Sequence, residues 1–292
     1  MSTSANTNDA VGNATTPNSN NARQPKRSGK KKGCFWGFVA IAIIAGAIYY
    51  FKPTPPEIDP HKHTFSVDGV EFKMVFVEGG TFLMGATPDQ VNEAFSVEKP
   101  AHEVTVDDFY IGETEVTQKL WKEVMGIDPS YDKGFNKPVE QVSWDDCQVF
   151  VRKLNRLTGK TFRLPTEAEW EYATRGGKKS LGYKFSGSIY LDDVAWWSDN
   201  SDGTTHAIKQ KRPNELGIYD MAGNVSEWCQ DYFDFYNSSP QRNPTGLANG
   251  ELCVVRGGSY CTDEKNSRVS CRGFLKPSIR HKCIGLRLAM KP

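Results

Sequence analysis

Hydrophobic and polar positions divide the chain into four zones. Residues 1–32 are almost entirely polar, and residues 33–51 form a run of 19 residues without a charge, GCFWGFVAIAIIAGAIYYF. Residues 52–66 are proline-rich, and residues 67–292 contain short segments with helical or strand periodicity. This pattern predicts a polar tail, one long apolar helix, a linker and one folded domain.

The apolar run has the length of a transmembrane helix. As an α-helix it would extend about 28 Å, close to the hydrocarbon thickness of a bilayer. Aromatic residues gather at its two ends, Phe35 and Trp36 at one and Tyr49 and Tyr50 at the other. The alternative is a cleaved signal peptide, but the run is longer than a typical signal core and no clear A-x-A site follows it. We expect a retained signal anchor.

The basic residues of the tail predict the orientation of this helix. Six of them lie within residues 1–32, just before the apolar run. Because cytoplasmic flanks carry the excess of Lys and Arg, the N-terminus should be cytoplasmic and the C-terminal domain periplasmic or extracellular. The tail itself has too little apolar surface to fold and should be disordered. Residues 52–66 should form a stiff proline-rich spacer.

Charge excludes one class of partner. Residues 1–32 hold six basic residues and one acidic residue, so the rest of the chain holds 30 basic and 34 acidic residues, a net charge of −4. A domain that binds nucleic acid is expected to be strongly basic. Nucleic-acid binding therefore has no electrostatic support.

Periodicity and capping residues predict the first elements of the domain. Residues 72–77 and 102–106 alternate apolar and polar positions, which predicts half-buried strands. Ser143 with Asp146, and Thr166 with Glu169, precede apolar faces and predict two helices. A third, short helix should follow Thr117. Beyond residue 180 turn-forming residues recur every few positions, which predicts long loops held by buried aromatic side chains.

Several motifs occur together in the order typical of one family. They are Val77–Gly85 (VEGGTFLMG), Glu115–Thr117 (EVT), Pro138–Trp144 (PVEQVSW), Arg163–Ala173 (RLPTEAEWEYA), Gly217–Val225 (GIYDMAGNV) with Glu227–Trp228, and Arg256–Ser259 (RGGS). The chain resembles the formylglycine-generating enzyme, or sulfatase-modifying factor, family, as a membrane-anchored bacterial member. The resemblance covers about Met74 to Met290 and implies an α+β, loop-rich variant of the C-type lectin fold.

The resemblance also implies an activity and a metal. Active family members are copper-dependent oxidases that convert the cysteine of a Cys-x-Pro-x-Arg segment to formylglycine, and they hold Cu(I) between two thiolates. Counted from Tyr260, the two thiolate positions of this chain hold Thr262 and Ser267. A hydroxyl is a poor ligand for Cu(I). The sequence therefore argues against copper binding and against the reaction of the family.

Other side chains near this motif remain candidates for chemistry. Cys261 lies one position before Thr262, and Cys271 lies four positions after Ser267. Cys283 directly precedes Ile284-Gly285, and relatives usually carry Asn at the position of Cys283. Ser259 is the cleft serine of the family, but no histidine partner for it is evident in the sequence. We name five candidate residues in the cleft without assigning a catalytic role: Ser259, Cys261, Ser267, Cys271 and Cys283.

The cysteines also have a structural interpretation. Outside the cytoplasm, two of Cys253, Cys261, Cys271 and Cys283 are expected to form a disulfide, or all four to stay buried and inert. The sequence does not decide which of them pair. Cys147 and Cys229 stand beside aromatic residues and should be packing residues.

One calcium site is implied by the resemblance. Asn224 and Glu227, with the backbone of Ala222, Gly223 and Val225, match a site built from carbonyl and carboxylate oxygens, which suit Ca²⁺. The alternative is that Asn224 and Glu227 only satisfy backbone donors in a turn.

Three functions remain open. The first is a membrane-tethered pseudoenzyme whose cleft binds a protein, peptide or glycan, or which scaffolds an envelope complex. The second is a copper-dependent formylglycine-generating oxidase, or a related oxidoreductase acting on protein cysteine, with shifted thiols. The third is a hypervariable ligand-binding protein of the same fold, although such proteins are often Asn-rich in the C-terminal motif and this one has only Asn266 there.

Overall fold

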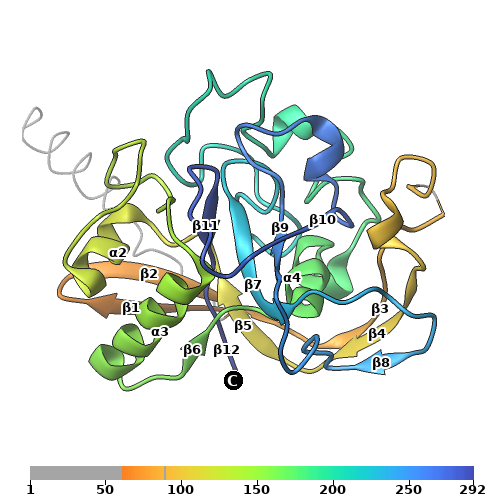
Figure 1. Ribbon diagram of the computed structural model, residues 1–292, viewed down its shortest axis with the longest axis horizontal. Helices are drawn as coiled ribbons and strands as arrows, with labels where there is room; N and C mark the ends of the chain where they lie inside the picture. Colours follow the sequence, from red (N-terminus) through yellow and green to blue (C-terminus); the bar gives the residue numbers. More distant parts are fainter. Residues whose placement is uncertain (1–60, 89) are drawn as a thin grey trace, which may run out of the picture. The chain divides into compact units, whose positions relative to one another are not determined.

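The computed structural model describes residues 61–88 and 90–292 (Figure 1). The predicted tail, the predicted transmembrane helix and residues 52–60 lie outside this part of the chain. Within it, no helix is long and apolar enough to cross a membrane. Strand β1 (Lys62–Val67) begins inside the segment that the sequence analysis assigned to the linker, so the folded domain starts about one strand earlier.

One sheet has five strands in the order β1-β2-β5-β12-β6. Its other members are β2 (Val70–Val77), β5 (Phe109–Gly112), β12 (Ala289–Met290) and β6 (Phe162–Arg163), and all neighbours are antiparallel. The strand predicted at residues 72–77 is confirmed within β2. The C-terminal strand β12 lies between β5 and β6, so the last residues of the domain close this sheet.

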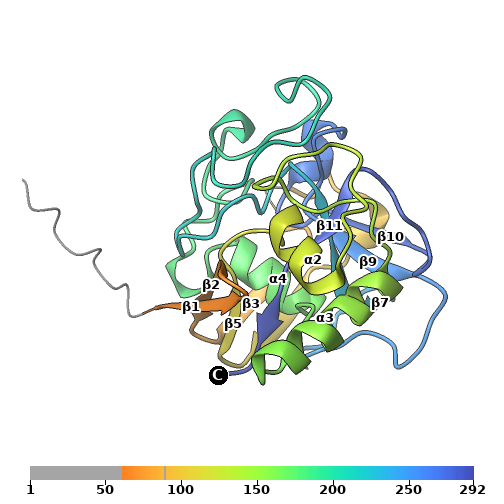
Figure 2. The ribbon, with the colours of Figure 1, turned by 90° about the vertical axis from the view of Figure 1, so that its left-hand side faces the viewer.

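Two helices pack together beside this sheet, α2 (Gln118–Met125) and α3 (Trp144–Thr158) (Figures 1 and 2). Both begin where their caps predict. Thr117 Oγ1 accepts from Leu120 N at 3.2 Å, and Ser143 forms a capping box with Asp146. Both end at a glycine with positive φ, which ends a helix without steric cost.

The helix predicted after Thr166 is α4 (Glu167–Thr174), which begins at the capping box of Thr166 and Glu169. It contacts the two smaller sheets. One has the order β3-β4-β8, with β3 (Gly80–Met84), β4 (His102–Val106) and β8 (Gln241–Arg242). The strand predicted at residues 102–106 is thus confirmed. Trp170 of α4 is fully buried in the core that these elements share.

The remaining sheet holds the C-terminal motif. Its order is β10-β9-β7-β11, with β10 (Arg272–Leu275), β9 (Cys253–Arg256), β7 (Ser226–Tyr232) and β11 (Ile284–Leu286). Strands β7 and β11 are parallel, and the other neighbours are antiparallel. Residues 175–225, between α4 and β7, are loops with two short 3₁₀ turns, Gly177–Lys179 and Leu191–Asp193. The expected mixture of helices, short strands and long loops is confirmed.

Candidate functional site

Buried arginine–glutamate pairs hold the C-terminal motif in place. Each pair joins this motif to a distant element, and no member is more than 5% exposed. The pairs are Arg256–Glu171, Arg268–Glu98, Arg272–Glu167 and Arg287–Glu227. Because breaking a buried ion pair leaves an uncompensated charge, the path of the motif is fixed by these contacts.

The electrostatics of Glu98 illustrate this arrangement. Burial alone raises the pKa of this carboxyl, but hydrogen bonds from Arg268 and Ser270 outweigh burial and bring the pKa below its ordinary value. Glu98 is therefore an ionised partner of Arg268. The short 3₁₀ helix that contains it, Ser96–Glu98, is bound to the turn before β10.

Two glycines turn the chain after β9 and bury Ser259. Gly257 and Gly258 have φ of 97° and 68°, a region that favours glycine. A Cβ on Gly258 would lie 2.6 Å from Ser267 Oγ, so the two segments touch here. The turn leaves Ser259 fully buried, with its Oγ 3.2 Å from Cys261 Sγ.

The two positions that hold thiolates in the family hold hydroxyls with no metal-binding geometry. Thr262 Oγ1 accepts from Ser259 N at 2.8 Å and donates to Ser259 O at 3.1 Å, so it closes a local turn. Ser267 Oγ is buried and has no hydrogen-bond partner within the described chain. Neither oxygen can replace a thiolate toward Cu(I).

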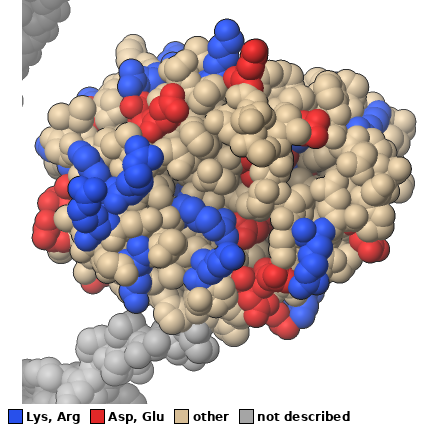
Figure 3. Space-filling view, turned by 60° about the horizontal axis from the view of Figure 1, so that its bottom comes forward, with Lys and Arg blue, Asp and Glu red and all other residues tan. Residues whose placement is uncertain are grey.

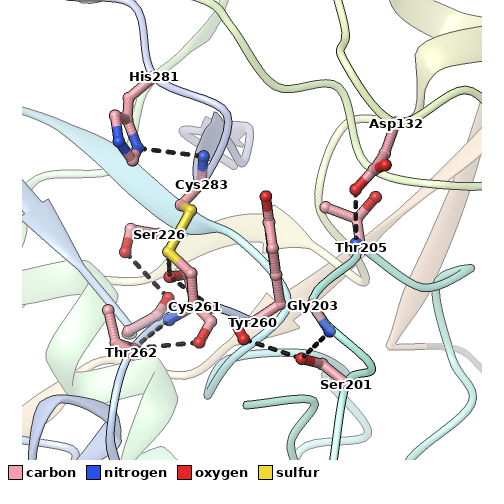
Figure 4. Close-up of a disulfide and its surroundings, with 12 residues drawn as sticks. Asp132, Ser201, Gly203, Thr205, Ser226, Tyr260, Cys261, Thr262, His281 and Cys283 are labelled. Carbon is pink, nitrogen blue, oxygen red and sulfur yellow. Dashed lines mark hydrogen bonds between the residues drawn. A yellow bond between two sulfur atoms is a disulfide. The ribbon is translucent and has the colours of Figure 1, made fainter. Parts of the chain in front are cut away.

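The structure joins Cys261 and Cys283 in a disulfide and keeps Cys271 apart (Figure 4). The two paired residues are 22 positions apart, with a Cα–Cα distance of 6.6 Å. Cys271 is a buried free thiol, and burial raises its pKa to about 11. The expected disulfide among the four C-terminal cysteines is therefore present, and a shifted pair of Cys261 with Cys271 is not formed.

The other cysteines of the described chain lie in the core. Cys147 and Cys229 are fully buried, and burial raises the pKa of both thiols well above the ordinary value. Cys253 on β9 is also buried, which raises its pKa to about 12. Thiols held neutral in this way are poor nucleophiles and poor metal ligands.

The residues matched to a calcium site are already engaged inside the protein. Glu227 accepts hydrogen bonds from Arg287 on both oxygens and from Trp170 Nε1 at 2.7 Å. Asn224 Oδ1 accepts from His206 N at 2.9 Å, and its amide donates to Glu115. The side-chain oxygens of Asn224 and Glu227 are therefore already engaged in hydrogen bonds. In this arrangement they do not fit as ligands of a calcium ion.

The backbone around Asn224 is also used locally. Asn224 itself has a positive φ of 54°, and its carbonyl accepts from Tyr260 N at 2.8 Å. Asn224 thus ties the Gly223 turn to the C-terminal motif. Among residues 61–88 and 90–292, no group of three or more His, Cys, Asp or Glu side chains is placed to hold a metal ion.

One buried acid near the motif was missed by sequence reasoning. Glu140 has no exposed surface; its Oε1 accepts from Asp132 N at 2.8 Å, while Oε2 has no partner in the part of the chain that is described. Burial raises its pKa to about 7. A signal existed, since Glu140 is the one acid within the otherwise apolar and neutral stretch Pro138–Trp144.

An exposed apolar surface lies on the connection between α2 and α3. Ile127, Tyr131 and Phe135 are 68%, 69% and 70% exposed. Lys282 Nζ is 5.7 Å from the centre of the Tyr131 ring, which places this connection beside the segment that carries Cys283. Exposed aromatic side chains such as Tyr131 and Phe135 can contribute to a protein interface. We call these three residues the apolar loop.

Another groove lies elsewhere on the described part of the chain. It has a volume of about 820 Å³, and its lining includes Asp107 after β4, Arg163 of β6, Glu169 of α4 and Arg242 of β8. None of the cleft candidates lines it. On the side of the domain near the C-terminus, acidic and basic side chains are interspersed (Figure 3).

Residues 63–292 match the model of the sulfatase-modifying factor enzyme 1-like domain. The chain belongs to this family. It is 36% identical over 250 residues to the "Chaperone protein LppX" of Paenibacillus barcinonensis, covering 68% of this chain and 82% of that protein. It is 38% identical over 173 residues to the formylglycine-generating enzyme of Streptomyces coelicolor, covering 53% of this chain and 52% of the enzyme.

A solved structure gives the same fold. "Treponema denticola variable protein 1" superposes with a TM-score of 0.74 and 32% identity, covering 80% of this chain and all of that one. The chain spans 38% of the length of a Chlamydia caviae relative named serine/threonine-protein kinase pkn1. Family membership and the family fold are thereby shown, and the resemblance read from the motifs is confirmed.

Proposed function

We propose that this chain is a membrane-tethered, non-catalytic member of the sulfatase-modifying factor family that binds a protein or peptide outside the cytoplasm. Among the ligand classes open from sequence, a protein or peptide is favoured over a glycan by the apolar loop. Tyrosine and phenylalanine side chains supply much of the binding energy at protein interfaces.

One observation carries the non-catalytic part of the proposal. The two thiolate positions hold Thr262, which closes a turn, and Ser267, which is buried under Gly258. The nearest alternative sulfurs, Cys261 and Cys283, are bonded to each other. The site therefore offers no pair of free thiolates for Cu(I), which the family reaction requires.

Two observations support the binding part. The apolar loop is exposed beside the segment that carries Cys283. The relative from Paenibacillus barcinonensis, which matches this chain over most of its own length, is named a chaperone protein. A chaperone binds exposed apolar segments of other chains, and the apolar loop has the chemistry for such a contact.

The catalytic part is tested with the substrate segment of the family. The full-length protein is incubated with copper and a Cys-x-Pro-x-Arg peptide, and formylglycine is detected by the mass change of the cysteine. The Streptomyces coelicolor enzyme serves as the active control. We expect no conversion by this chain, and turnover comparable to that of the control would refute the proposal.

The binding part is tested by the aggregation of a chemically denatured model protein such as citrate synthase. We expect the wild-type chain to slow the rise of light scattering and the variant Y131S/F135S to lose most of this effect. The matched control is L157S, because Leu157 on α3 is 56% exposed but lies outside the apolar loop. Equal protection by all three proteins would remove the apolar loop as the binding surface.

A second candidate is a variable ligand-binding protein. The likeness to the Treponema denticola structure, which is named a variable protein, favours it. This function predicts that copies of the gene in different isolates differ mainly at the exposed positions of the motif, such as Asp263 and Lys265. Sequencing such copies would separate the two candidates, since a chaperone-like protein has no reason to concentrate changes there.

A further inference from the structure

The Cys261–Cys283 disulfide is exposed on one side only. Cys261 lies in the exposed part of the loop after Ser259, whereas Cys283 is 3% exposed at the start of β11. Cys261 is therefore the half of the disulfide that an incoming thiolate can approach, whereas Cys283 is enclosed. Attack at Cys261 would release Cys283 as the leaving group, so the geometry gives the two sulfurs different roles.

The segment just before Cys283 is basic. Cys283 is preceded by Arg280, His281 and Lys282, and its backbone N–H donates to His281 Nδ1 at 3.2 Å. Figure 4 shows His281 next to the disulfide and Asp132 on the far side of Tyr260. Arg280 is ion-paired with Asp146, and His281 Nδ1 accepts the Cys283 N–H, so Lys282 is the basic sequence neighbour whose charge can stabilise a departing thiolate.

The residues around Cys261 suit an exchanging sulfur. Ser259 is fully buried, and its Oγ lies 3.2 Å from Cys261 Sγ. At this distance the Ser259 hydroxyl can donate a hydrogen bond to the Cys261 sulfur when that sulfur carries negative charge. Cys261 N also approaches Ser259 Oγ at 3.4 Å, so the turn holds the hydroxyl against the exposed sulfur.

Buried ion pairs flank both halves of the disulfide. Both segments that it joins are anchored by buried ion pairs, Arg256–Glu171 before Cys261 and Arg287–Glu227 after Cys283. The remaining thiols of the described chain, Cys147, Cys229, Cys253 and Cys271, are all buried. Among the described residues, Cys261 is thus the sulfur that solvent and another protein can reach.

We propose that Cys261–Cys283 is a redox-active disulfide that exchanges with cysteine thiols of other proteins. A thiolate of the partner attacks Cys261 Sγ, a partner–Cys261 disulfide forms, the Cys261–Cys283 bond breaks, and Cys283 leaves as a thiolate. A second thiolate of the partner then attacks its own mixed-disulfide sulfur and releases Cys261 as a thiolate. The partner dithiol is oxidised to a disulfide by two electrons, and this chain is reduced to two thiols.

This activity goes beyond the proposed binding function and does not depend on it. The aggregation test examines the apolar loop, whereas the tests below examine the sulfurs, so either can fail alone. If Y131S/F135S loses its effect on aggregation and still exchanges with thiols at the wild-type rate, the two properties are separate. The inference concerns only the chemistry at Cys261 and Cys283.

The first test measures reduction in the native state. The full-length protein in detergent is treated with dithiothreitol, alkylated with a maleimide and mapped by mass spectrometry. We expect Cys261 and Cys283 to be labelled while Cys147 and Cys253 stay unlabelled and the near-UV circular dichroism stays unchanged. Labelling of Cys261 and Cys283 only together with the buried cysteines would mean reduction through unfolding, and would overturn the proposal.

The second test separates the roles of the two sulfurs with glutathione disulfide as the probe. In the variant C283S the exposed Cys261 should form a stable glutathione adduct, at least about tenfold faster than Cys283 does in C261S, because reactivity follows exposure and thiolate character. The double variant C261S/C283S shows whether the domain stays folded without either sulfur. Equal rates in the two single variants would contradict the assigned roles.

Discussion

Two side chains of the loop after Ser259 argue against the copper chemistry of the family. Thr262 and Ser267 stand where two thiolates would bind Cu(I), and each is used or enclosed by its neighbours. A cysteine at Thr262 would lose the two hydrogen bonds that close the Ser259 turn. The change from thiol to hydroxyl therefore gives the loop a structural contact in place of a metal ligand.

Glu140 gives a prediction about pH. Burial raises its pKa from about 4.5 to about 7, so the folded state holds this proton more tightly than the unfolded state. The contribution of Glu140 to the free energy of unfolding is therefore highest at low pH. It falls by an amount on the order of 3 kcal/mol as the pH rises from about 4.5 to about 7 and Glu140 loses its proton. Glutamine stays neutral throughout. We expect E140Q to raise the melting temperature at pH 8 and to change it little at pH 4.

The measurement is a thermal melt of both proteins over this pH range. The control is E251Q, since Glu251 is exposed and its substitution should leave the pH dependence of the melting temperature as in the wild type. If the wild type and E140Q show parallel curves, Glu140 is not a buried acid with a raised pKa.

Asn224 and Glu227 give a prediction about calcium. Because Arg287, Trp170 and His206 already occupy their oxygens, we expect a calcium chelator to leave the melting temperature of the protein unchanged. Differential scanning calorimetry with EGTA and with added CaCl₂ measures this directly. A clear fall in EGTA that CaCl₂ reverses would restore the calcium site implied by the family.

At the scale of elements, capping predicts helix boundaries better than composition predicts strands. Ser143, Thr166 and Thr117 place the starts of three helices correctly, because a cap is a local contact between a side chain and the first turn. Strands β7, β9, β10 and β11 were not predicted. β9 and β11 are short and fully buried and β7 is mostly buried, so these three lack the alternating pattern of a half-exposed strand, and β10 has only four residues.

The candidate site was predictable only in part, because some of its contacts are local in the sequence and others are not. The frame, Arg256–Ser259 and Ile284–Arg287, and the missing thiolates follow from spacing along the chain. The pairing of Cys261 with Cys283 does not, because it depends on the parallel pairing of β11 with β7, which brings residues 284–286 beside residues 226–228. Long-range pairing of this kind has no local sequence signal.

The cap of α3 gives a prediction at this scale. Ser143 Oγ accepts from Asp146 N at 3.1 Å, while Asp146 accepts from Ser143 N and from Arg280. We expect S143A to lower the free energy of unfolding by about 1 kcal/mol, the usual cost of losing an N-cap. Urea denaturation followed by circular dichroism measures this. S239A, in an exposed loop, should stay within about 0.5 kcal/mol of the wild type.

At the scale of the whole molecule, the disulfide and the N-terminal sequence point to the same compartment. Disulfides persist outside the cytoplasm, where the environment is oxidising. The basic tail and the apolar run of residues 33–51 independently predict that the domain lies on that side of the membrane. The orientation itself stays a prediction.

This orientation gives the last prediction. We expect the full-length protein to sediment with membranes and to resist extraction with carbonate, because about 19 apolar residues suffice to span a bilayer. A variant lacking residues 1–51 and expressed in the cytoplasm should be released as a soluble protein with Cys261 and Cys283 reduced. In spheroplasts, an added protease should digest the C-terminal domain of the full-length protein while a cytoplasmic marker stays intact. Protection of the domain under these conditions would place it in the cytoplasm, and would remove the oxidising environment that the exchange activity requires.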